Sequence, residues 1–425
     1  MIGEIIAIGN ELTSGRVLNT TSRFAAGLLF GAGHEIISMA TIRDTPAEIS
    51  ESLQRAINRS DFIIVTGGLG ATSDDLTSEA VGLALGLPIV FHPDIFAKIK
   101  ARHPAADEQA YTTLKKLAML PTGAETLNPE AKMAGYLLVH GGKPIFFLPG
   151  VPHEMQELLT DKVIPRLGVW QEGVAQLVEQ RVYKVFGLGE TEINRRIAHL
   201  EKEEDGRIRI GYYPVFPEVH LSLAVIDRKE ATIKSTFRHL EDEIVTALGD
   251  SMFGTDDDTM ESVIGELLQK QGKTLATAES CTGGLIGHKI TSVPGSSNYF
   301  TGGVIAYSNN LKKILLGVDP GLLAAYGAVS SATARAMADG IRAKTAADIG
   351  LSVTGIAGPA GGSLEKPVGT VFIGLSTPDD TIDIPCLFPG DRWQVQELTA
   401  VTSLDLIRRH LLGKNLEQLD FIKKE

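Results

Sequence analysis

The chain has 425 residues, too many for one ordinary hydrophobic core, and this length predicts two or three domains. Hydrophobic residues make up 43% and charged residues 22%, a balance typical of a soluble globular protein. The formal net charge of −12 argues against a broad basic surface for nucleic acid, although it leaves room for a local basic patch.

The N-terminus and the cysteines bear on the cellular compartment. The first residues enter a strand-like run directly, without the basic and apolar regions of a signal peptide, and no apolar run reaches transmembrane length. The two cysteines, Cys281 and Cys386, form neither a metal-binding spacing nor a disulfide framework. We therefore expect a cytoplasmic protein with no membrane partner.

The first third of the chain alternates strand and helix signals. Buried strands are expected at 4–8, 61–65 and 144–148, and an amphipathic helix at 20–31. This alternation predicts an α/β domain with a mostly parallel sheet covered on both faces. Because ligands of such sheets bind beyond the carboxyl ends of the strands, the loops that follow these strands are the candidate binding loops.

These loops carry glycines and acidic side chains. They span 9–15, 67–77 and 149–152. Glycines let the backbone approach a phosphate, and Asp74 and Asp75 are hard oxygen ligands for a divalent cation. The alternative for the two aspartates is a capped helix start. The loops match neither a Walker A motif nor the dinucleotide-binding GxGxxG pattern, so together they predict a phosphate or nucleotide pocket of another kind.

A smaller α+β module follows. Strands are expected at 182–186, 208–214 and 219–225, and a helix at 232–247. The acidic run at 201–205 argues against a nucleic-acid-binding face. We interpret the module as a spacer and interface element.

The last part of the chain returns to the α/β pattern. Helices are expected at 259–271 and from 390–392 onwards, and strands at 302–309, 349–355 and 371–375. The central stretch, 278–284, is a hydroxyl- and glycine-rich turn between a short buried strand and a helix. Such a turn places side-chain nucleophiles beside free backbone N–H groups, which suits an anion or a developing oxyanion. The alternative is an ordinary helix N-cap.

Several long motifs in this order make the chain resemble the CinA family. The segments 9–12, 67–77 and 149–155 resemble the N-terminal domain of that family, which is similar to the molybdopterin-binding MoaB/MogA proteins. The middle module resembles the KH-like connector of CinA proteins but lacks the RNA-clamping GXXG loop. The chain from Lys273 onwards resembles the family's C-terminal domain, which also exists alone as a nicotinamide mononucleotide deamidase. The expected architecture is a MoaB/MogA-like α/β domain at 1–165, a KH-like α+β connector at 166–252 and an α/β amidohydrolase domain at 253–415.

For the first domain, the resemblance implies a divalent-metal-dependent pyrophosphatase that acts on ADP-ribose. Asp74 and Asp75 would lie near the metal or the pyrophosphate. The residues implied in substrate binding are Gly67, Gly68 and Gly70 along the phosphates, with Asn10 and Glu11 opposite. A molybdopterin-type binding domain without hydrolase action is the rival interpretation. One departure from the family is Ala71, where proline is usual; it loosens the loop without removing a ligand.

For the C-terminal domain, the resemblance implies hydrolysis of an amide without a cofactor. Release of ammonia needs a nucleophile, a proton acceptor, an oxyanion partner and a substrate clamp. Ser280 is the preferred nucleophile, Lys312 the base with a pKa lowered by burial, and Tyr307 the group that orients them or relays a proton. The expected substrate contacts are Thr282, Gly283 and Gly284 for the oxyanion or phosphate, Ser296, Thr354 and Gly355 for the ribose phosphate, and Arg392 as phosphate clamp.

Some assignments stay open at this point. Thr282 and Ser296 compete with Ser280 as nucleophile, and Cys281 offers a thiol, although a small buried residue is the favoured interpretation of it. Gln396 and Glu397 stand where the family often carries arginines, which weakens the expected phosphate binding.

The resemblance also implies partners. We expect a homodimer that binds nicotinamide mononucleotide and ADP-ribose, without direct nucleic-acid binding. A non-catalytic protein linked to competence or DNA damage is the second rival.

Overall fold

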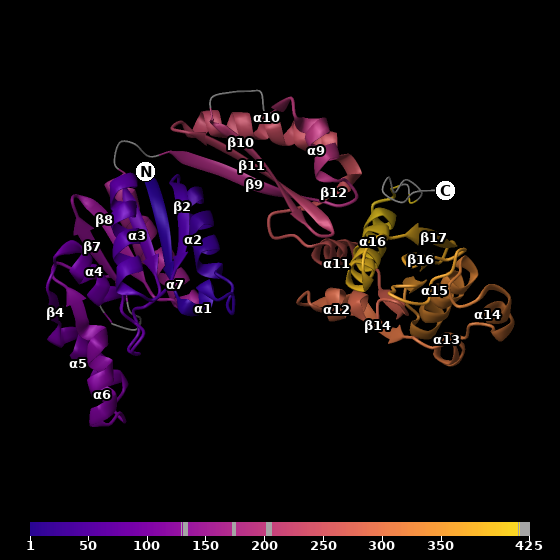
Figure 1. Ribbon diagram of the computed structural model, residues 1–425. Coiled ribbons are helices and arrows are strands. Elements are labelled where there is room, and N and C mark those ends of the chain that lie inside the picture. The colour runs from indigo at the N-terminus through magenta and orange to yellow at the C-terminus, as the bar shows by residue number, and fades with distance from the viewer. Residues whose placement is uncertain (129, 131–134, 172–175, 201–205, 415, 417–425) are drawn as a thin grey trace. The chain divides into compact units, whose positions relative to one another are not determined.

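The computed structural model describes residues 1–128, 130, 135–171, 176–200, 206–414 and 416. It divides into two compact units, one formed by residues 1–180 with 225–237 and the other by 181–224 with the chain from 238 onwards (Figure 1). The acidic run at 201–205 and the expected domain end at 415 lie outside the described residues.

The first unit contains a six-stranded sheet in the order β2-β1-β3-β8-β7-β6. Its strands are β1 (Ile2–Ile8), β2 (Glu35–Ile42), β3 (Phe62–Thr66), β6 (Glu125–Thr126), β7 (Tyr136–His140) and β8 (Lys143–Leu148). The first four in this order are parallel, whereas β7 and β6 extend the sheet antiparallel. The reversal occurs at Gly141 and Gly142, whose φ angles of 57° and 79° suit a two-residue hairpin turn.

Helices cover both faces of this sheet. Ile5 and Ile64 pack with α2 (Thr20–Gly31), α7 (Pro152–Leu158) and α8 (Ile164–Trp170). The alternate side chains, Ile6 and Val65, pack with α3 (Pro46–Arg59) and α4 (Thr77–Leu85). The remaining elements of this part are α1 (Asn10–Thr13), β4 (Ile89–Phe91), α5 (Pro93–Arg102), α6 (Glu108–Leu114) and β5 (Met119–Pro121). The expected α/β layering, with strands buried on both faces, is confirmed.

The connector has a four-stranded sheet in the order β10-β11-β9-β12. Its strands are β9 (Leu177–Val185), β10 (Ile208–Val215), β11 (Glu218–Asp227) and β12 (Met252–Thr255), and its helices are α9 (Glu190–Ile197) and α10 (Glu230–Leu248). Side chains of β9 reach α10, where Arg181 and Tyr183 both contact Glu241. The α+β character expected from the sequence is therefore present.

The C-terminal part contains a five-stranded sheet in the order β14-β13-β15-β16-β17. The strands are β13 (Leu275–Glu279), β14 (Phe300–Ile305), β15 (Ile349–Gly355), β16 (Thr370–Ser376) and β17 (Thr381–Leu387). Strands β14, β13 and β15 are parallel, and β16 and β17 continue antiparallel. The carboxyl ends of β13 and β15 therefore meet at one edge of the sheet.

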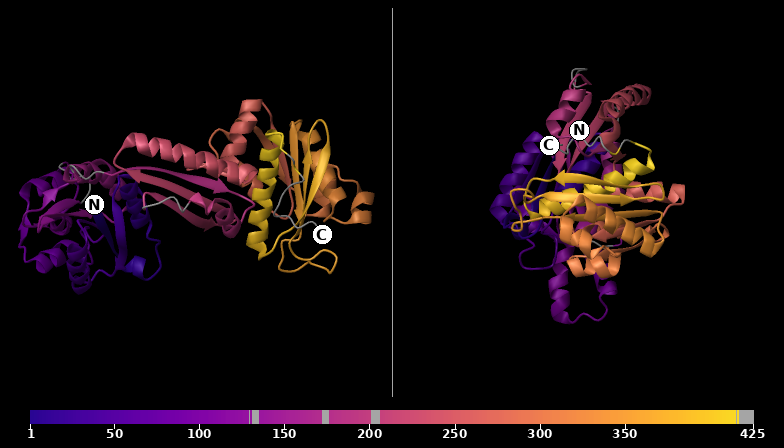
Figure 2. Two further views of the ribbon diagram at one scale, coloured as in Figure 1. Left: turned by 90° about the horizontal axis from the view of Figure 1, so that it is seen from above. Right: turned by 90° about the vertical axis from the view of Figure 1, so that its right-hand side faces the viewer.

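Two layers of helices enclose this sheet (Figures 1 and 2). One layer is α11 (Met260–Gln271), α12 (Leu285–Thr291) and α16 (Arg392–Leu411), which share a core with Leu351 and Val353. The other is α13 (Asn309–Leu316), α14 (Pro320–Tyr326) and α15 (Ser331–Thr345), of which α13 and α15 pack with Ala276 and Ala278.

Most expected strands end within one or two residues of the end found in the structure, but one differs by more. The strand expected at 302–309 ends at Ile305, because Ser308 is already the N-cap of α13 and its hydroxyl accepts a hydrogen bond from the Leu311 N–H. This earlier helix start determines where Lys312 points. None of the described helices combines the length and apolarity needed to cross a membrane.

Candidate functional site

Ser280 lies at the carboxyl end of β13, in the turn that leads to α12. Its backbone N–H donates to the Val353 carbonyl of the neighbouring parallel strand at 3.1 Å, which continues the β13–β15 pairing by one residue. The side chain is 8% exposed. The sheet therefore holds this hydroxyl at the edge where ligands of parallel sheets bind.

Lys312 is the residue that makes the Ser280 hydroxyl chemically distinctive. It lies one turn into α13, is only 1% exposed, and its Nζ is 2.9 Å from Ser280 Oγ and 2.7 Å from the Ala306 carbonyl oxygen. Burial lowers the pKa of the Lys312 ammonium below its ordinary value. The next residue, Lys313, is exposed, so the helix turns one lysine inward and leaves the other in solvent.

The pair opens into a cavity of about 300 Å³. Six residues predicted from the sequence line it: Ser280, Tyr307, Lys312, Thr354, Gly355 and Arg392. They come from four separate stretches of the chain, and the fold brings them to one place. Cys281, Asn309, Ala328, Val329 and the glycine-rich loop that follows β15 complete the lining.

Arg392 is fixed at the rim of this cavity. One of its guanidinium nitrogens donates to the Gly358 carbonyl at 2.7 Å and the other to the Tyr307 hydroxyl at 2.9 Å. Both Tyr307 and Arg392 are exposed. The Tyr307 hydroxyl therefore orients the arginine at the cavity entrance.

The loop after β15 offers backbone donors to the same cavity. Within the described part of the chain, the N–H groups of Ala357 and Gly358 donate no hydrogen bond, although both residues are buried and line the cavity. Gly358 has a φ of 86°, a conformation that favours glycine. Unpaired buried N–H groups are rare and suit an anion. The sequence showed the glycines, but not that these particular donors remain available.

Thr282, Gly283 and Gly284, in the turn between β13 and α12, were expected to bind an oxyanion or a phosphate. In the structure, Thr282 and Gly284 donate to a side chain of the protein instead. The buried carboxylate of Glu279 accepts the Thr282 hydroxyl at 2.7 Å, the Gly284 N–H at 3.0 Å and the Gly287 N–H at 2.8 Å. The N-terminus of α12 is thus already occupied by a negative charge of the chain. The structure does not bring Thr282, Gly283 or Gly284 into the cavity lining, because this internal carboxylate takes the place expected for an oxyanion or phosphate.

The other expected substrate contacts, Ser296, Thr354 and Gly355, differ in their position relative to the cavity. Ser296 begins a short 3-10 helix, Ser296–Asn298, and is not among the residues that line the cavity. Thr354 lines it, but its hydroxyl already donates to the Ala328 carbonyl at 2.7 Å. Gly355 lies where a Cβ would come within 2.7 Å of Val371, so close packing of β15 on β16 requires this glycine. Of the three competing hydroxyls, Ser280 is the one beside Lys312.

The three side chains left open by the sequence, those of Cys281, Gln396 and Glu397, have structural roles here. Burial raises the pKa of the Cys281 thiol to about 12, so this side chain stays a protonated thiol at neutral pH. Gln396 donates to the Cys281 carbonyl at 2.8 Å, and Glu397 forms an ion pair with Lys289 at 2.9 Å. Gln396 and Glu397 stand where arginines were expected. They hold α16 against the Ser280 turn and against α12.

In the first unit, the predicted loops meet at the carboxyl edge of the sheet. The Gly67 N–H donates to the Leu148 carbonyl at 3.1 Å, and the Asn10 N–H donates to the Asp44 carboxylate at 2.7 Å. Burial, together with the neighbouring negative charges of Glu11, Asp74 and Asp75, raises the pKa of Asp44. Asp44 was missed by the sequence reasoning, although it follows β2 at the same edge.

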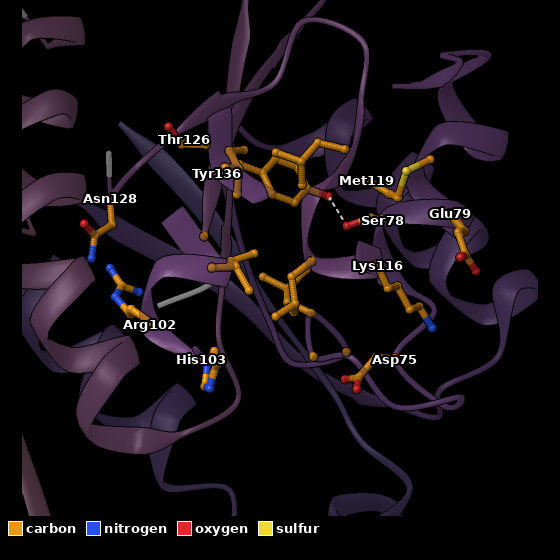
Figure 3. A pocket seen from close by; sticks show the side chains of 18 residues that line it. Asp75, Ser78, Glu79, Arg102, His103, Lys116, Met119, Thr126, Asn128 and Tyr136 are labelled. Atoms are coloured by element: carbon orange, nitrogen blue, oxygen red, sulfur yellow. Dashed lines mark hydrogen bonds between the residues drawn. The ribbon is translucent and has the colours of Figure 1, made fainter. Parts of the chain in front are cut away.

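A cavity of about 330 Å³ opens beside these loops (Figure 3). Its lining includes the predicted residues Gly68, Gly70 and Asp75, while Gly67, Asn10, Glu11 and Asp74 do not belong to it. Basic side chains on its wall are Arg102, His103 and Lys116, and apolar ones include Ile95, Ile99, Met119 and Leu120. Asp75 and Glu79 also line it, so the cavity combines basic and acidic side chains with an apolar wall.

The described side chains of the acidic edge do not form a metal site on their own. Among the described residues, no three His, Cys, Asp or Glu side chains converge closely enough to hold a metal by themselves. Asp75 accepts hydrogen bonds from the N–H and the hydroxyl of Thr72, which orient it. The mutual repulsion of the carboxylates around Asp44 is what a cation would relieve. A divalent cation at this edge would therefore need ligands from outside the chain in addition to one or two of these carboxylates.

Three family profiles cover the chain in sequence order. Residues 4–168 match the "Probable molybdopterin binding domain", residues 180–254 match the "Damage-inducible protein CinA KH domain" and residues 257–411 match the "CinA C-terminal domain". The fold is accordingly a MoaB/MogA-like domain, a KH-like domain and a CinA C-terminal domain, as expected.

Whole-length relatives agree with these profiles, and parts of the chain are also similar to solved structures. The chain is 53% identical to a CinA-like protein of Desulfotalea psychrophila over 96% of this chain and 98% of that protein, and 37% identical to a CinA-like protein of Geotalea daltonii over 97% and 100%. A crystal structure of competence/damage inducible protein CihA from Agrobacterium tumefaciens covers 37% of this chain and 94% of that one at 35% identity and a TM-score of 0.35. A structure of the molybdopterin biosynthesis enzyme MoaB from Thermus thermophilus covers 39% and 91% at 22% identity and a TM-score of 0.28. On the strength of the whole-length relatives, this chain belongs to the CinA family.

Proposed function

We propose that the C-terminal domain hydrolyses the carboxamide of nicotinamide mononucleotide to nicotinate mononucleotide and ammonia. The observation that carries this proposal is the buried Lys312 Nζ at 2.9 Å from Ser280 Oγ, at the wall of a cavity. A buried amine with a lowered pKa beside a serine hydroxyl is the arrangement of a Ser-Lys nucleophile pair.

The residues of the pair have complementary roles in this reaction. Neutral Lys312 accepts the Ser280 proton while Ser280 Oγ bonds to the carboxamide carbon. The tetrahedral intermediate then collapses, its C–N bond breaks, and the Lys312 ammonium returns the proton to the leaving nitrogen, which departs as ammonia. Water hydrolyses the resulting ester, with Lys312 again as base, and releases the carboxylate and free Ser280.

We assign anion recognition to Arg392 at the rim of the cavity and to the glycine-rich loop that follows β15. The Arg392 guanidinium, oriented by Tyr307, is the proposed clamp for the 5′-phosphate. The N–H groups of Ala357 and Gly358 are the donors that we assign to a negatively charged oxygen in the cavity, either of the phosphate or of the intermediate. No cofactor is needed for these steps.

The substrate class can be tested by comparing a substrate that carries the 5′-phosphate with one that lacks it. Ammonia release is measured with nicotinamide mononucleotide and with nicotinamide riboside, which lacks the phosphate. Arg392→Ala should raise KM for the mononucleotide by about 10- to 100-fold, the worth of a charge-assisted phosphate contact, and should change the riboside reaction far less. Equal effects on KM for both substrates would show that Arg392 does not bind the substrate phosphate.

For the N-terminal domain we propose a metal-dependent ADP-ribose pyrophosphatase. What supports it is the 330 Å³ cavity, whose apolar wall suits a base and whose Arg102, His103 and Lys116 suit a pyrophosphate, next to the acidic edge (Figure 3). Asp44 and Asp75 are the carboxylates that we assign to the cation. A divalent cation bound there would neutralise phosphate charge and lower the pKa of water.

The chain's own groups would bind and orient the substrate. Lys116 Nζ donates to the Thr72 carbonyl at 2.8 Å, and its ammonium group therefore lies against the loop that carries Asp75. Release of AMP from ADP-ribose, assayed with Mg²⁺, with Mn²⁺ and with a chelator, separates this proposal from its rival. Metal-dependent AMP release supports hydrolysis. Tight binding of molybdopterin without any AMP release would support a binding domain instead.

We further propose a homodimer that recycles pyridine nucleotides and does not bind nucleic acid directly. Sedimentation would report the oligomeric state. A DNA complex that weakens steeply with salt would favour the rival, a protein of competence or DNA damage that acts on DNA itself.

A further inference from the structure

The first two turns of α16 connect the amidohydrolase cavity to the connector. The helix begins rigidly, because Asp391 and Gln394 form a reciprocal capping box. Residues four apart lie on one side of a helix, so Arg392 and Gln396 share one side and Trp393 and Glu397 share the next. Each side meets a different part of the molecule.

The side with Arg392 and Gln396 faces the cavity. Arg392 donates to Gly358 and to Tyr307, and Gln396 donates to the carbonyl of Cys281, the residue after Ser280. A shift of this part of the helix would therefore move the proposed phosphate clamp relative to the Ser280 turn.

The side with Trp393 and Glu397 faces the tip of the β10–β11 hairpin and the groups around it. Residues 181–224 and the chain from 238 onwards belong to one compact unit, and within it the centroid of the Phe216 ring lies 5.3 Å from that of the Trp393 ring. Phe216 is in the two-residue turn between β10 and β11. The hairpin thus reaches the residue next to Arg392.

A second contact lies one turn further along the helix. Glu397 pairs with Lys289 of α12 at 2.9 Å, and the two side chains are 16% and 21% exposed. Glu218, the first residue of β11, interacts electrostatically with Lys289 and is held by His220 at 3.1 Å. The hairpin therefore contacts α16 through Phe216, and the positive charge of Lys289, which pairs with Glu397, also acts on Glu218 of the hairpin.

This packing matters because Arg392 is exposed. A free arginine side chain loses rotamer freedom when it binds a phosphate, and holding it in the bound orientation beforehand removes part of that cost. Such preorganisation strengthens substrate binding without changing the chemistry at Ser280.

We propose that the β10–β11 hairpin of the connector is a positioning element of the amidohydrolase site, which acts through Phe216 and Trp393 to hold Arg392 for the substrate phosphate. The connector is then a part of the substrate-binding apparatus and not only a spacer. This inference rests on the proposed function of the cavity.

The experiment is a double-mutant cycle on the full chain, with ammonia release from nicotinamide mononucleotide as readout. Phe216→Ala and Trp393→Ala should each raise KM about two- to tenfold, the worth of an aromatic pair, with kcat unchanged. The double variant should be no worse than the poorer single variant, because both changes remove the same contact. Phe216→Tyr should restore KM, since it restores a ring.

The matched control is Tyr213→Ala, which removes an exposed aromatic ring from β10 of the same hairpin and should leave KM unchanged. An unchanged KM in Phe216→Ala, additive effects in the double variant, or a fall in kcat with constant KM would each overturn the proposal.

A second measurement does not depend on catalysis. The chain has two tryptophans, so Trp170→Phe leaves Trp393 as the sole reporter. Inorganic phosphate titrated into this protein should alter Trp393 fluorescence, and Phe216→Ala should weaken the apparent affinity about two- to tenfold. Phosphate affinity that is absent, or that is indifferent to Phe216, would contradict the hairpin's role. A parent that releases no ammonia but shows the Phe216-dependent phosphate affinity would overturn the amidohydrolase function alone.

Discussion

At the scale of single residues, the protonation of Lys312 determines whether Ser280 can be activated. Only the neutral amine can accept the hydroxyl proton, and burial lowers the pKa from its ordinary 10.5, so the neutral fraction at a given pH is larger than for a lysine in water. We expect kcat/KM for nicotinamide mononucleotide to rise with pH and to reach its plateau well below pH 10.5.

The check is a rate profile between about pH 6 and pH 10, in which kcat/KM reports groups of the free enzyme. A rate that keeps climbing tenfold per pH unit through the top of this range would mean a lysine with an ordinary pKa. That result would exclude Lys312 as a base tuned by burial.

The candidate site was predictable from the sequence wherever a residue follows a strand. Ser280 and Gly355 lie at or next to such strand ends, and Arg392 opens the last helix. Asp44 follows the same rule and was overlooked because no glycine marks its loop. The availability of the Ala357 and Gly358 N–H groups could not be predicted, because it depends on which backbone bonds the folded loop leaves unmade.

At the scale of elements, the turn between β13 and α12 shows how a helix start can be closed by the chain itself. Glu279 is 2% exposed, and its carboxylate accepts hydrogen bonds from Thr282, Gly284, Ile286 and Gly287. We interpret this carboxylate as the group that fixes the turn and thereby Ser280. The sequence pattern of hydroxyls and glycines indicated an anion at this place, but not that the anion is the glutamate just before the turn.

Glu279→Gln should therefore destabilise the protein. It removes the charge from several charge-assisted hydrogen bonds at a helix N-terminus, and we expect the free energy of unfolding to fall by about 2–3 kcal/mol. Glu266→Gln on the exposed side of α11 is the matched control and should change it by less than about 0.5 kcal/mol. Urea denaturation measures the free energy of unfolding of both variants. Equally small changes would show that the Glu279 carboxylate does not stabilise the turn electrostatically.

Most elements were predictable because their hydrophobic period is clear. The helix at Thr20–Gly31 has the bounds expected from the sequence, and the helix starting at Met260 differs by one residue. The strand expected at 371–375 is present as β16, but its antiparallel direction was not anticipated, because strand direction depends on the connections and not on the pattern within a strand. Strand β7, which is also antiparallel to its neighbour, was not expected as a strand.

At the scale of the whole molecule, the two candidate sites lie in different compact units. Each is built from side chains of its own unit, so we expect their activities to be separable. Ser280→Ala should abolish ammonia release and leave AMP release from ADP-ribose within about twofold, whereas Asp75→Asn should lower AMP release about 100-fold or more and leave ammonia release intact.

The two assays on one preparation of each variant give this comparison directly. A variant that loses both activities while its thermal unfolding is unchanged would show that the sites depend on each other. Such a result would require communication between the units and would contradict two independent sites.

The central claim is that Ser280 and Lys312 form the nucleophile pair of an amidohydrolase, and ammonia release from nicotinamide mononucleotide tests it most directly. The parent, Ser280→Ala, Lys312→Ala and the exposed control Lys313→Ala are compared, with circular dichroism to verify folding. The account predicts activity in the parent and in Lys313→Ala, and a loss of about a thousandfold or more in each of the other two. Activity that survives Ser280→Ala in the folded protein, or a parent that releases no ammonia, would contradict it.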